Sequence, residues 1–355
     1  MGALEKTLKD VFPQDAEYRA KAKARLDQLA VPHWALGDLM DLAIDLAGMT
    51  RSMQPPVGRK AIVTMAGDHG VTVEGVSKFP KEVTPQMVVN FVYGGAGINA
   101  LARQAGARVF VVDMGVDADL RDLADAGKII NKKVGMGTAN IAVGPAMSPA
   151  MARRAVESGI DVAEMLADDF DIFGTGDMGI GNTTPSTAIA AVCTGRSAEE
   201  LTGRGTGLDD AQLAKKVKII ERILAVNKPD PKDGLDILAK VGGFEIGGIA
   251  GLIIGAAARR KPVLVDGFIS TAGALIAYKI EPFVRDYLIF AHRSVEPGHR
   301  YMQEMLGCKQ PLLDLNFRLG EGTGAAVAMN LVEGAVAILT EVATFAEAAV
   351  AAADK

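Results

Sequence analysis

The chain has 355 residues, which is long enough for a large buried core and one large domain with an appendage. Hydrophobic residues make up 49% of the chain and charged residues 23%, a composition typical of globular proteins. The formal net charge of −5, with one tryptophan and five tyrosines, argues against nucleic-acid binding, because that function needs a basic face and stacking aromatic side chains.

Helical and strand patterns alternate along most of the chain. Residues 15–50 carry charged and apolar positions at helical spacing, and Pro55 and Pro56 then break the pattern. The predicted strands are KAIVTMA (60–66), RVFVVDMG (108–115), DDFDIFG (168–174), KPVLVDG (261–267) and DYLIFAH (286–292). The predicted helices between them span residues 84–105, 149–167, 184–193, 209–226 and 270–279. This alternation predicts an α/β fold with a mostly parallel sheet flanked by helices, and a ligand beside the carboxyl ends of the strands.

The end of the chain is predicted to be helical again. Glu333, Glu341 and Glu347 interrupt the apolar run after residue 325, so we expect a core helix or helix pair and no membrane span. The two terminal helical segments are expected to pack together as a smaller lobe. The first ten residues lack an apolar signal core and the two cysteines are far apart, so a cytoplasmic location is expected.

The glycine-rich segment that begins at Gly174 can be interpreted in two ways. Gly174, Gly176 and Gly179 satisfy G-x-G-x-x-G after a predicted strand, which is formally the dinucleotide fingerprint. A dinucleotide-dependent oxidoreductase is therefore the alternative function. The acid expected to bind the ribose is missing, because Glu199 and Glu200 lie in SAEE, which is typical of a helix start.

The same segment also suits a phosphate. We predict a helix that begins at Thr184, with Pro185 as its first residue. The backbone N–H groups of residues 179–184 and the hydroxyls of Thr183 and Thr184 would then surround an anion at a helix N-terminus. A plain N-cap turn is the alternative interpretation.

Two other loops hold ionisable side chains. Asp68 and His69 in GDHG are too few for a metal site, so a strand-end turn with a hydrogen-bonded histidine is favoured. Ser294, Glu296 and His299 follow a predicted strand and would allow a serine triad. The chain has no G-x-S-x-G motif, so that interpretation is disfavoured.

Two further segments remain open on spacing alone. Phe79, Gln86 and Met87 suit either an apolar slot for a flat ring or ordinary loop packing. The predicted helix 209–226 carries three lysines, none of which spacing selects as a phosphate ligand: Lys215, Lys216 and Lys218.

RLGEGTGAA places Glu321 among glycines just before the last long helix. An acid near a helix start suits the helix dipole and needs no further role. The neighbouring glycines would also let the backbone approach a flat ligand closely.

Taken as a set, long segments of the chain resemble one enzyme family. They are GDHGVTVEGVSKFPKEVT, GTGDMGIGNTTPSTA, NKPDPKDGLDILAKVGGFEIGGIAGLIIGAA, PVLVDGFISTAGALIA and RLGEGTGAA. Together they resemble nicotinate-nucleotide–dimethylbenzimidazole phosphoribosyltransferases over nearly the whole chain. The resemblance implies phosphoribosyl transfer from nicotinate mononucleotide to 5,6-dimethylbenzimidazole or a related lower-ligand base, in assembly of the cobalamin nucleotide loop. The products would be α-ribazole 5′-phosphate and nicotinate.

The resemblance also implies an architecture. A large Rossmann-like α/β domain would cover residues 56–324, and residues 1–55 would join residues 325–355 in a small helical domain. The enzyme would be a homodimer that needs no cofactor and no metal. In the segment VPHWALG (31–37) the chain departs from the KPPGSLG common in the family, so Trp34 either alters a wall of the site or only repacks a helix.

The resemblance assigns roles to individual residues. Glu321 would be the general base that takes the proton of the attacking benzimidazole. Asp177 matches a position where relatives have glutamate, and would assist at the ribose or the nucleophile. The residues implied in holding the nucleotide are Gly176, Gly179, Asn182, Thr183, Lys216 and Ser294. The residues implied in lining the base slot are Phe79, Gln86, Met87, Met178 and Leu319.

Two alternatives to this catalyst stay open. The accepted base varies among relatives, so 5-methoxybenzimidazole, adenine or a phenol are alternatives to dimethylbenzimidazole. A non-catalytic nucleotide-binding protein is a further alternative, against which the retained Glu321 argues.

Overall fold

The computed structural model describes residues 2–205 and 207–351. Six strands form one sheet in the order β3-β2-β1-β4-β5-β6, and every pairing is parallel. The strands are β1 (Lys60–Gly67), β2 (Ala107–Gly115), β3 (Ile130–Asn131), β4 (Ile172–Met178), β5 (Val263–Val265) and β6 (Leu288–Phe290). The predicted parallel α/β fold is confirmed. The strand order reverses between β1 and β4, and such a reversal opens a ligand crevice at the carboxyl ends of the two strands.

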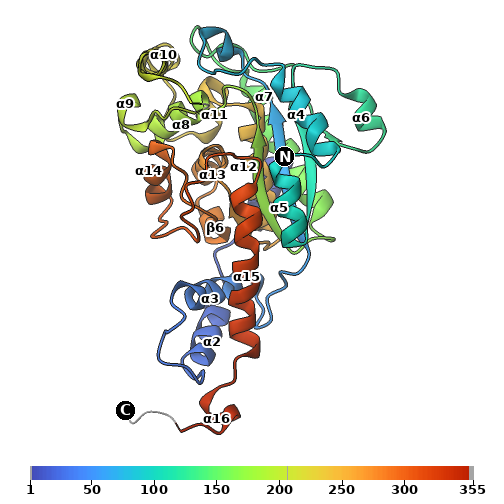
Figure 1. Ribbon diagram of the computed structural model, residues 1–355, viewed down its shortest axis with the longest axis vertical. Helices are drawn as coiled ribbons and strands as arrows, with labels where there is room; N and C mark the ends of the chain where they lie inside the picture. The colour runs from blue at the N-terminus through green and yellow to red at the C-terminus, as the bar shows by residue number, and fades with distance from the viewer. Residues whose placement is uncertain (1, 206, 352–355) are drawn as a thin grey trace.

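Helices cover both faces of the sheet (Figure 1). The helices α7 (Pro149–Leu166), α12 (Phe244–Ala258) and α13 (Phe268–Ile280) pack together on one face. The helices α4 (Val83–Val92), α5 (Gly97–Ala105) and α15 (Thr323–Glu341) cover the other. This two-sided cover follows from right-handed crossovers that run in opposite directions on either side of the strand-order reversal.

The other α-helices complete the layers and the connections. They are α1 (Ala3–Thr7), α2 (Ala16–Leu26), α3 (Asp38–Thr50), α6 (Arg121–Asp125), α8 (Thr183–Thr194), α9 (Ala198–Leu201), α10 (Asp210–Asn227), α11 (Gly234–Val241), α14 (Pro297–Met305) and α16 (Phe345–Ala348). The 3-10 helices are η1 (Leu8–Asp10), η2 (Gly70–Glu74) and η3 (Pro282–Tyr287).

The sheet contains one strand that was not predicted, β3, and two further differences bear on the site. The run predicted as strand 168–174 starts later, at Ile172, and the glycine-rich stretch continues it to Met178. Glycines serve as strand residues here because a Cβ on Gly174 would lie 2.4 Å from the side chain of Ile62 in β1. The predicted helix 84–105 is two helices, because Gly94 adopts a φ of +80° between α4 and α5.

Helices α2 and α3 from the N-terminal part of the chain meet α15 from the C-terminal part beside the α/β layers. Figure 1 shows α15 running out of the α/β layers to lie along α2 and α3. The Arg25 guanidinium donates hydrogen bonds to the carbonyl oxygens of Leu339 and Val342, and Leu29 forms a bridge with Thr344. The segment α1 packs instead against α7 and α12. The division into domains at residues 55/56 and 324/325 stays a prediction.

One helix among the described residues, α15, is long and apolar enough to cross a membrane by length and composition. Half of its apolar window is buried inside the protein. A buried core helix meets the same criterion, so the finding is weak evidence for a membrane span.

Candidate active site

The turn of residues 320–322, called the Glu321 turn below, lies between the carboxyl ends of β1 and β4. The Thr64 hydroxyl of β1 donates to the Glu321 carbonyl oxygen at 2.9 Å, and the Glu321 N–H donates to the Asp177 carbonyl oxygen of β4 at 3.3 Å. All three residues of the turn have positive φ, with values of 81°, 64° and 99° in chain order. A non-glycine residue keeps such a conformation only where its surroundings enforce it.

The Glu321 side chain is 5% exposed and points to the start of α5. Its Oε2 accepts a hydrogen bond from the Ile98 N–H at 3.0 Å. Burial raises the pKa of the Glu321 carboxyl above its usual value, the Asp266 carboxylate adds to the rise, and the Ile98 N–H opposes it. A carboxylate with a raised pKa is a stronger base, which suits proton abstraction near neutral pH.

Asp177, at the end of β4, lies beside the Glu321 turn. A Cβ on Gly320 would lie 3.1 Å from Asp177 Oδ2, which also accepts a hydrogen bond from Asn182 Nδ2 at 3.0 Å. Burial, followed by the charges of Asp266 and Glu245, raises the Asp177 pKa well above its usual value. Its Oδ1 is buried and has no hydrogen-bond partner within the described residues. Asp177 therefore suits a neutral hydrogen-bond donor better than a second base.

A second group of polar side chains lies at the start of α8. Lys216 of α10 is only 1% exposed, and its Nζ donates to the Thr183 hydroxyl at 2.7 Å. Burial lowers the pKa of Lys216 to about 8, while the Glu296 carboxylate opposes the change. A Cβ on Gly205 would lie 3.5 Å from Lys216 Nζ and 3.2 Å from Thr183 Oγ1. The backbone of Gly205 therefore lies directly against these two side chains. A buried lysine beside a helix N-terminus suits a phosphate.

Fewer backbone N–H groups of residues 179–184 are available to a phosphate than the sequence suggested. The N–H groups of Ile180, Asn182 and Thr184 already donate to oxygens of the protein. The helix begins at Thr183, one residue earlier than predicted. The Thr184 hydroxyl is buried with no hydrogen-bond partner in the described part of the chain, so it remains free to turn toward a ligand.

The acids of SAEE do not provide the ribose contact of a dinucleotide site. Ser197 and Glu200 form a capping box at the start of α9, as the SAEE pattern indicated. Glu200 Oε2 accepts hydrogen bonds from the Ser197 N–H and hydroxyl. Glu200 thus caps a helix and Glu199 lies in the first turn of that helix, whereas the dinucleotide motif needs an acid at the end of a strand.

Ser294 and His299 form no catalytic triad. The Ser294 N–H, not its hydroxyl, donates to His299 Nδ1 at 2.9 Å. His299 Nε2 must then carry the proton and donates to the Thr271 hydroxyl at 2.9 Å. Burial lowers the pKa of His299 to about 3, so the ring is neutral and holds the loop that carries Ser294.

His69 is hydrogen-bonded as predicted, to a partner that the sequence did not indicate. His69 Nε2 lies 2.7 Å from Glu245 Oε1 of α12, and both side chains are fully buried. Burial alone would lower the pKa of His69, but the Glu245 carboxylate raises it above its usual value. Residues 2–205 and 207–351 contain no group of three His, Cys, Asp or Glu side chains suited to a metal ion.

The residues predicted for the base slot are more dispersed than the two predicted catalytic residues, Glu321 and Asp177. A Cβ on Gly97 would lie 2.9 Å from Leu319 Cδ2 and 3.3 Å from Glu321 Oε2, so both side chains lie over the start of α5. Met178 ends β4, while Gln86 and Met87 belong to α4, which contacts β1, β2 and β4. Phe79 is 54% exposed and Leu319 is 60% exposed. The slot is thus open to solvent in this structure.

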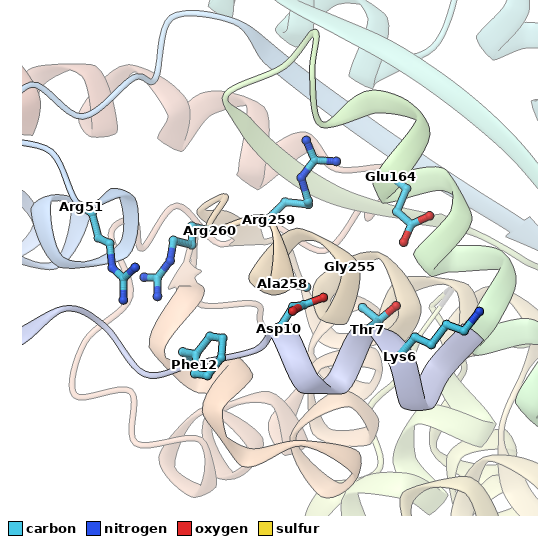
Figure 2. Close-up of a pocket in the computed structure, with 10 residues that line it drawn as sticks. All are labelled: Lys6, Thr7, Asp10, Phe12, Arg51, Glu164, Gly255, Ala258, Arg259 and Arg260. Carbon is cyan, nitrogen blue, oxygen red and sulfur yellow. The ribbon is translucent and has the colours of Figure 1, made fainter. Parts of the chain in front are cut away.

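Two cavities lie away from these residues. Figure 2 shows the first, of about 560 Å³, between the N-terminal segment and the end of α12. Arg259 and Arg260 line it and lie in the short connection before β5, which places the cavity at the amino end of that strand. The second, of about 570 Å³, is mostly apolar and includes Met147, Met151 and Phe244. Neither cavity is lined by a predicted site residue.

Comparisons with known sequences agree along the whole chain. A family profile described as phosphoribosyltransferase matches residues 11–350. The nicotinate-nucleotide–dimethylbenzimidazole phosphoribosyltransferase of Desulfotalea psychrophila is 72% identical over 355 residues, covering 100% of both chains. The protein of the same name from Geobacter sulfurreducens is 56% identical over 355 residues, again covering 100% of both.

Solved structures agree with the sequence comparison. The crystal structure of CobT from Thermus thermophilus superposes with a TM-score of 0.90 at 45% identity, over 95% of this chain and 100% of that chain. At such identity and coverage, the likeness extends from the fold to the family. The chain therefore belongs to the nicotinate-nucleotide–dimethylbenzimidazole phosphoribosyltransferase family.

Proposed function

We propose that this chain transfers the phosphoribosyl group of nicotinate mononucleotide to 5,6-dimethylbenzimidazole or a related lower-ligand base. The products are α-ribazole 5′-phosphate and nicotinate. The observation that carries the proposal is the buried Glu321 carboxylate at the carboxyl ends of β1 and β4, with Lys216 buried at the neighbouring start of α8. One group is a base and the other an anion ligand, and this transfer needs both.

The reaction explains why so few ionisable groups are needed. Nicotinate leaves C1′ with the electron pair of its glycosidic bond, which neutralises the pyridinium, so the leaving group needs no proton. One nitrogen of the benzimidazole attacks the opposite face of C1′, which inverts that carbon and produces the α anomer. The second nitrogen loses its proton to the Glu321 carboxylate, so the benzimidazole ring of the product is neutral. The negative carboxylate also stabilises the positive charge that develops in the transition state.

The other predicted residues would bind the substrates. We place the 5′-phosphate at Lys216, Thr183 and the start of α8, with Ser294 nearby on its loop. Asp177 in its neutral form would donate a hydrogen bond at the ribose or the base. Leu319 would contact the flat ring beside Glu321, and Met178, Phe79, Gln86 and Met87 would line the rest of the slot.

One assay tests the function. We expect purified protein with nicotinate mononucleotide and dimethylbenzimidazole to release nicotinate and a ribazole phosphate, separated by chromatography, in buffer that contains EDTA. Parallel reactions with 5-methoxybenzimidazole, adenine and a phenol identify the preferred base. Absence of nicotinate release with every base would overturn the proposal.

Replacing Lys216 by alanine is expected to raise KM for nicotinate mononucleotide about 10- to 100-fold, since a hydrogen bond to a charged group contributes about 1.5–3 kcal/mol. Lys218→Ala is the matched control, because Lys218 lies on the same helix but is exposed. In the wild-type enzyme, KM should also rise as the pH passes about 8, where Lys216 loses its charge. Equal KM values for Lys216→Ala and Lys218→Ala would remove Lys216 from the phosphate site.

We also propose that the protein is a cytoplasmic homodimer. Several large apolar side chains are exposed in the single chain, among them Val73 at 78%, Tyr93 at 78% and Val143 at 73%. Contact with a second copy would remove such surface from water. Light scattering coupled to size-exclusion chromatography should report twice the 37.1 kDa mass of the chain. A mass of one chain at micromolar concentration would contradict the dimer.

A further inference from the structure

We infer that Asp266, at the end of β5, is a positioning residue that holds the Glu321 turn in its reactive geometry. The inference rests on the proposed function and adds to it a residue that contacts no reacting atom. Asp266 is fully buried, and its carboxylate accepts three backbone hydrogen bonds from the turn and the helix that follows. Oδ2 accepts from the Gly322 N–H at 3.1 Å, and Oδ1 accepts from Gly324 at 2.7 Å and Ala325 at 3.1 Å.

These three bonds replace the missing N-cap of α15. Gly322 occupies the N-cap position and has no side chain to accept a hydrogen bond from the first turn. A carboxylate from a different strand satisfies the free N–H groups and complements the positive end of the helix dipole. Because Gly322 directly follows Glu321, fixing its N–H fixes the peptide that carries the base. This bond helps hold Glu321 in its strained, positive-φ conformation.

His292 closes the other side of Asp266. Its Nε2 lies 3.5 Å from Asp266 Oδ1, and its ring packs on the backbone of Gly324. A Cβ on Gly324 would lie 2.1 Å from His292 Cδ2 and 2.8 Å from Asp266 Oδ1. Only glycine at this position lets the ring, the carboxylate and the helix start meet. The packing of Asp266 and His292 on the start of α15 therefore depends on glycine at residue 324.

Asp266 also influences the base through its charge. The ionisable groups that interact with it are Glu321 in the turn, Asp177 of β4 and His292 after β6. The Asp266 carboxylate raises the pKa of Glu321 and, against the effect of burial, that of His292. Removing this charge would lower the Glu321 pKa and so extend activity to lower pH. A residue that only stabilised the fold would not shift the pH profile in this direction.

The test compares Asp266→Asn with two other variants in the full-length protein. Asparagine keeps the size but cannot accept three N–H donors, so kcat should fall at least tenfold. The Kd of nicotinate mononucleotide should change less than twofold, and the acidic limb of the kcat–pH profile should move to lower pH. Gly324→Ala displaces the same contact yet keeps the charge, so its kcat should fall while the acidic limb stays in place. Asp171→Asn is the matched control, a buried aspartate that accepts the Arg59 N–H at 2.9 Å.

The outcomes separate this inference from the proposed function. A wild-type protein without transfer activity would overturn the function itself. An active wild type with unchanged kcat in both Asp266→Asn and Gly324→Ala would overturn the inference alone. If Asp266→Asn lost kcat without any move of the acidic limb, or if Asp171→Asn moved the limb equally, the role assigned to Asp266 would also be wrong. Should Asp266→Asn not fold, Gly324→Ala with wild-type kcat would suffice to reject it.

Discussion

Replacing Glu321 by glutamine is expected to lower kcat about 10²- to 10⁴-fold, the usual contribution of a general base. The amide keeps the size of the side chain and its hydrogen bond from the Ile98 N–H, but it cannot take the benzimidazole proton. The nucleotide contacts at Lys216 and Thr183 do not involve Glu321, so the Kd of nicotinate mononucleotide should stay close to the wild-type value. Steady-state kinetics and titration calorimetry measure the two quantities.

Glu341→Gln is the control for this variant, because Glu341 is exposed at the far end of α15, the helix that follows the Glu321 turn. Its kcat should equal that of the wild type. Wild-type turnover in Glu321→Gln would exclude Glu321 as the base. A large rise in the Kd for nicotinate mononucleotide with little change in kcat would instead place Glu321 in substrate binding.

Gly176→Ala should both destabilise the protein and abolish most of its activity. A Cβ at residue 176 would lie 2.3 Å from the carbonyl oxygen of Glu321 and 2.9 Å from Thr64 Oγ1. The first obstacle is backbone, so the Glu321 turn must move away from β4. Overpacking of this kind costs about 1–3 kcal/mol of unfolding free energy. Displacing the base by even a few tenths of an ångström also removes its alignment with the substrate.

Gly58→Ala serves as the matched control, since nothing lies within 4 Å of its added Cβ. Thermal melts and kcat should be near wild type for Gly58→Ala and reduced together for Gly176→Ala. If Gly176→Ala melted like the wild type and only bound nicotinate mononucleotide more weakly, Gly176 would act on the nucleotide and not on the turn. The resemblance had implied that nucleotide role, whereas the structure shows a close approach of backbone.

Patterns in the sequence predicted regular elements well where burial and local pattern agree. Strand β1 and helices α7 and α10 lie within two residues of their expected ranges. A short, continuous apolar run is typical of a strand buried on both faces, and a period of 3.6 follows from helix geometry. The glycine-rich part of β4 was missed as strand. Glycine has a low strand propensity, and the reason for Gly174 and Gly176 lies in neighbours distant in sequence, Ile62 and Glu321.

One site residue had a signal in the sequence that the spacing argument overlooked. Lys216 precedes Ile219, Ile220 and Ile223 by three, four and seven positions, which places it on the buried face of α10. Lys215 and Lys218 do not share that face and are exposed. A charged residue on an apolar face is costly to bury without a partner, so this position marked the lysine that we propose as the phosphate ligand.

By itself, the sequence determined the fold class, the order of the elements and, through several long motifs, the family. These properties depend on residues close together in the chain or on matches that extend along it. Only the tertiary structure decided how the site is held: which carboxylate receives the Gly322 N–H, which histidine covers Gly324 and which aspartate has its pKa raised well above the usual value. Asp266 lies more than 50 residues from the turn it holds, at a separation of 56 from Gly322. Hydrogen bonds, burial and pKa depend on distances in space, and only folding brings these groups together.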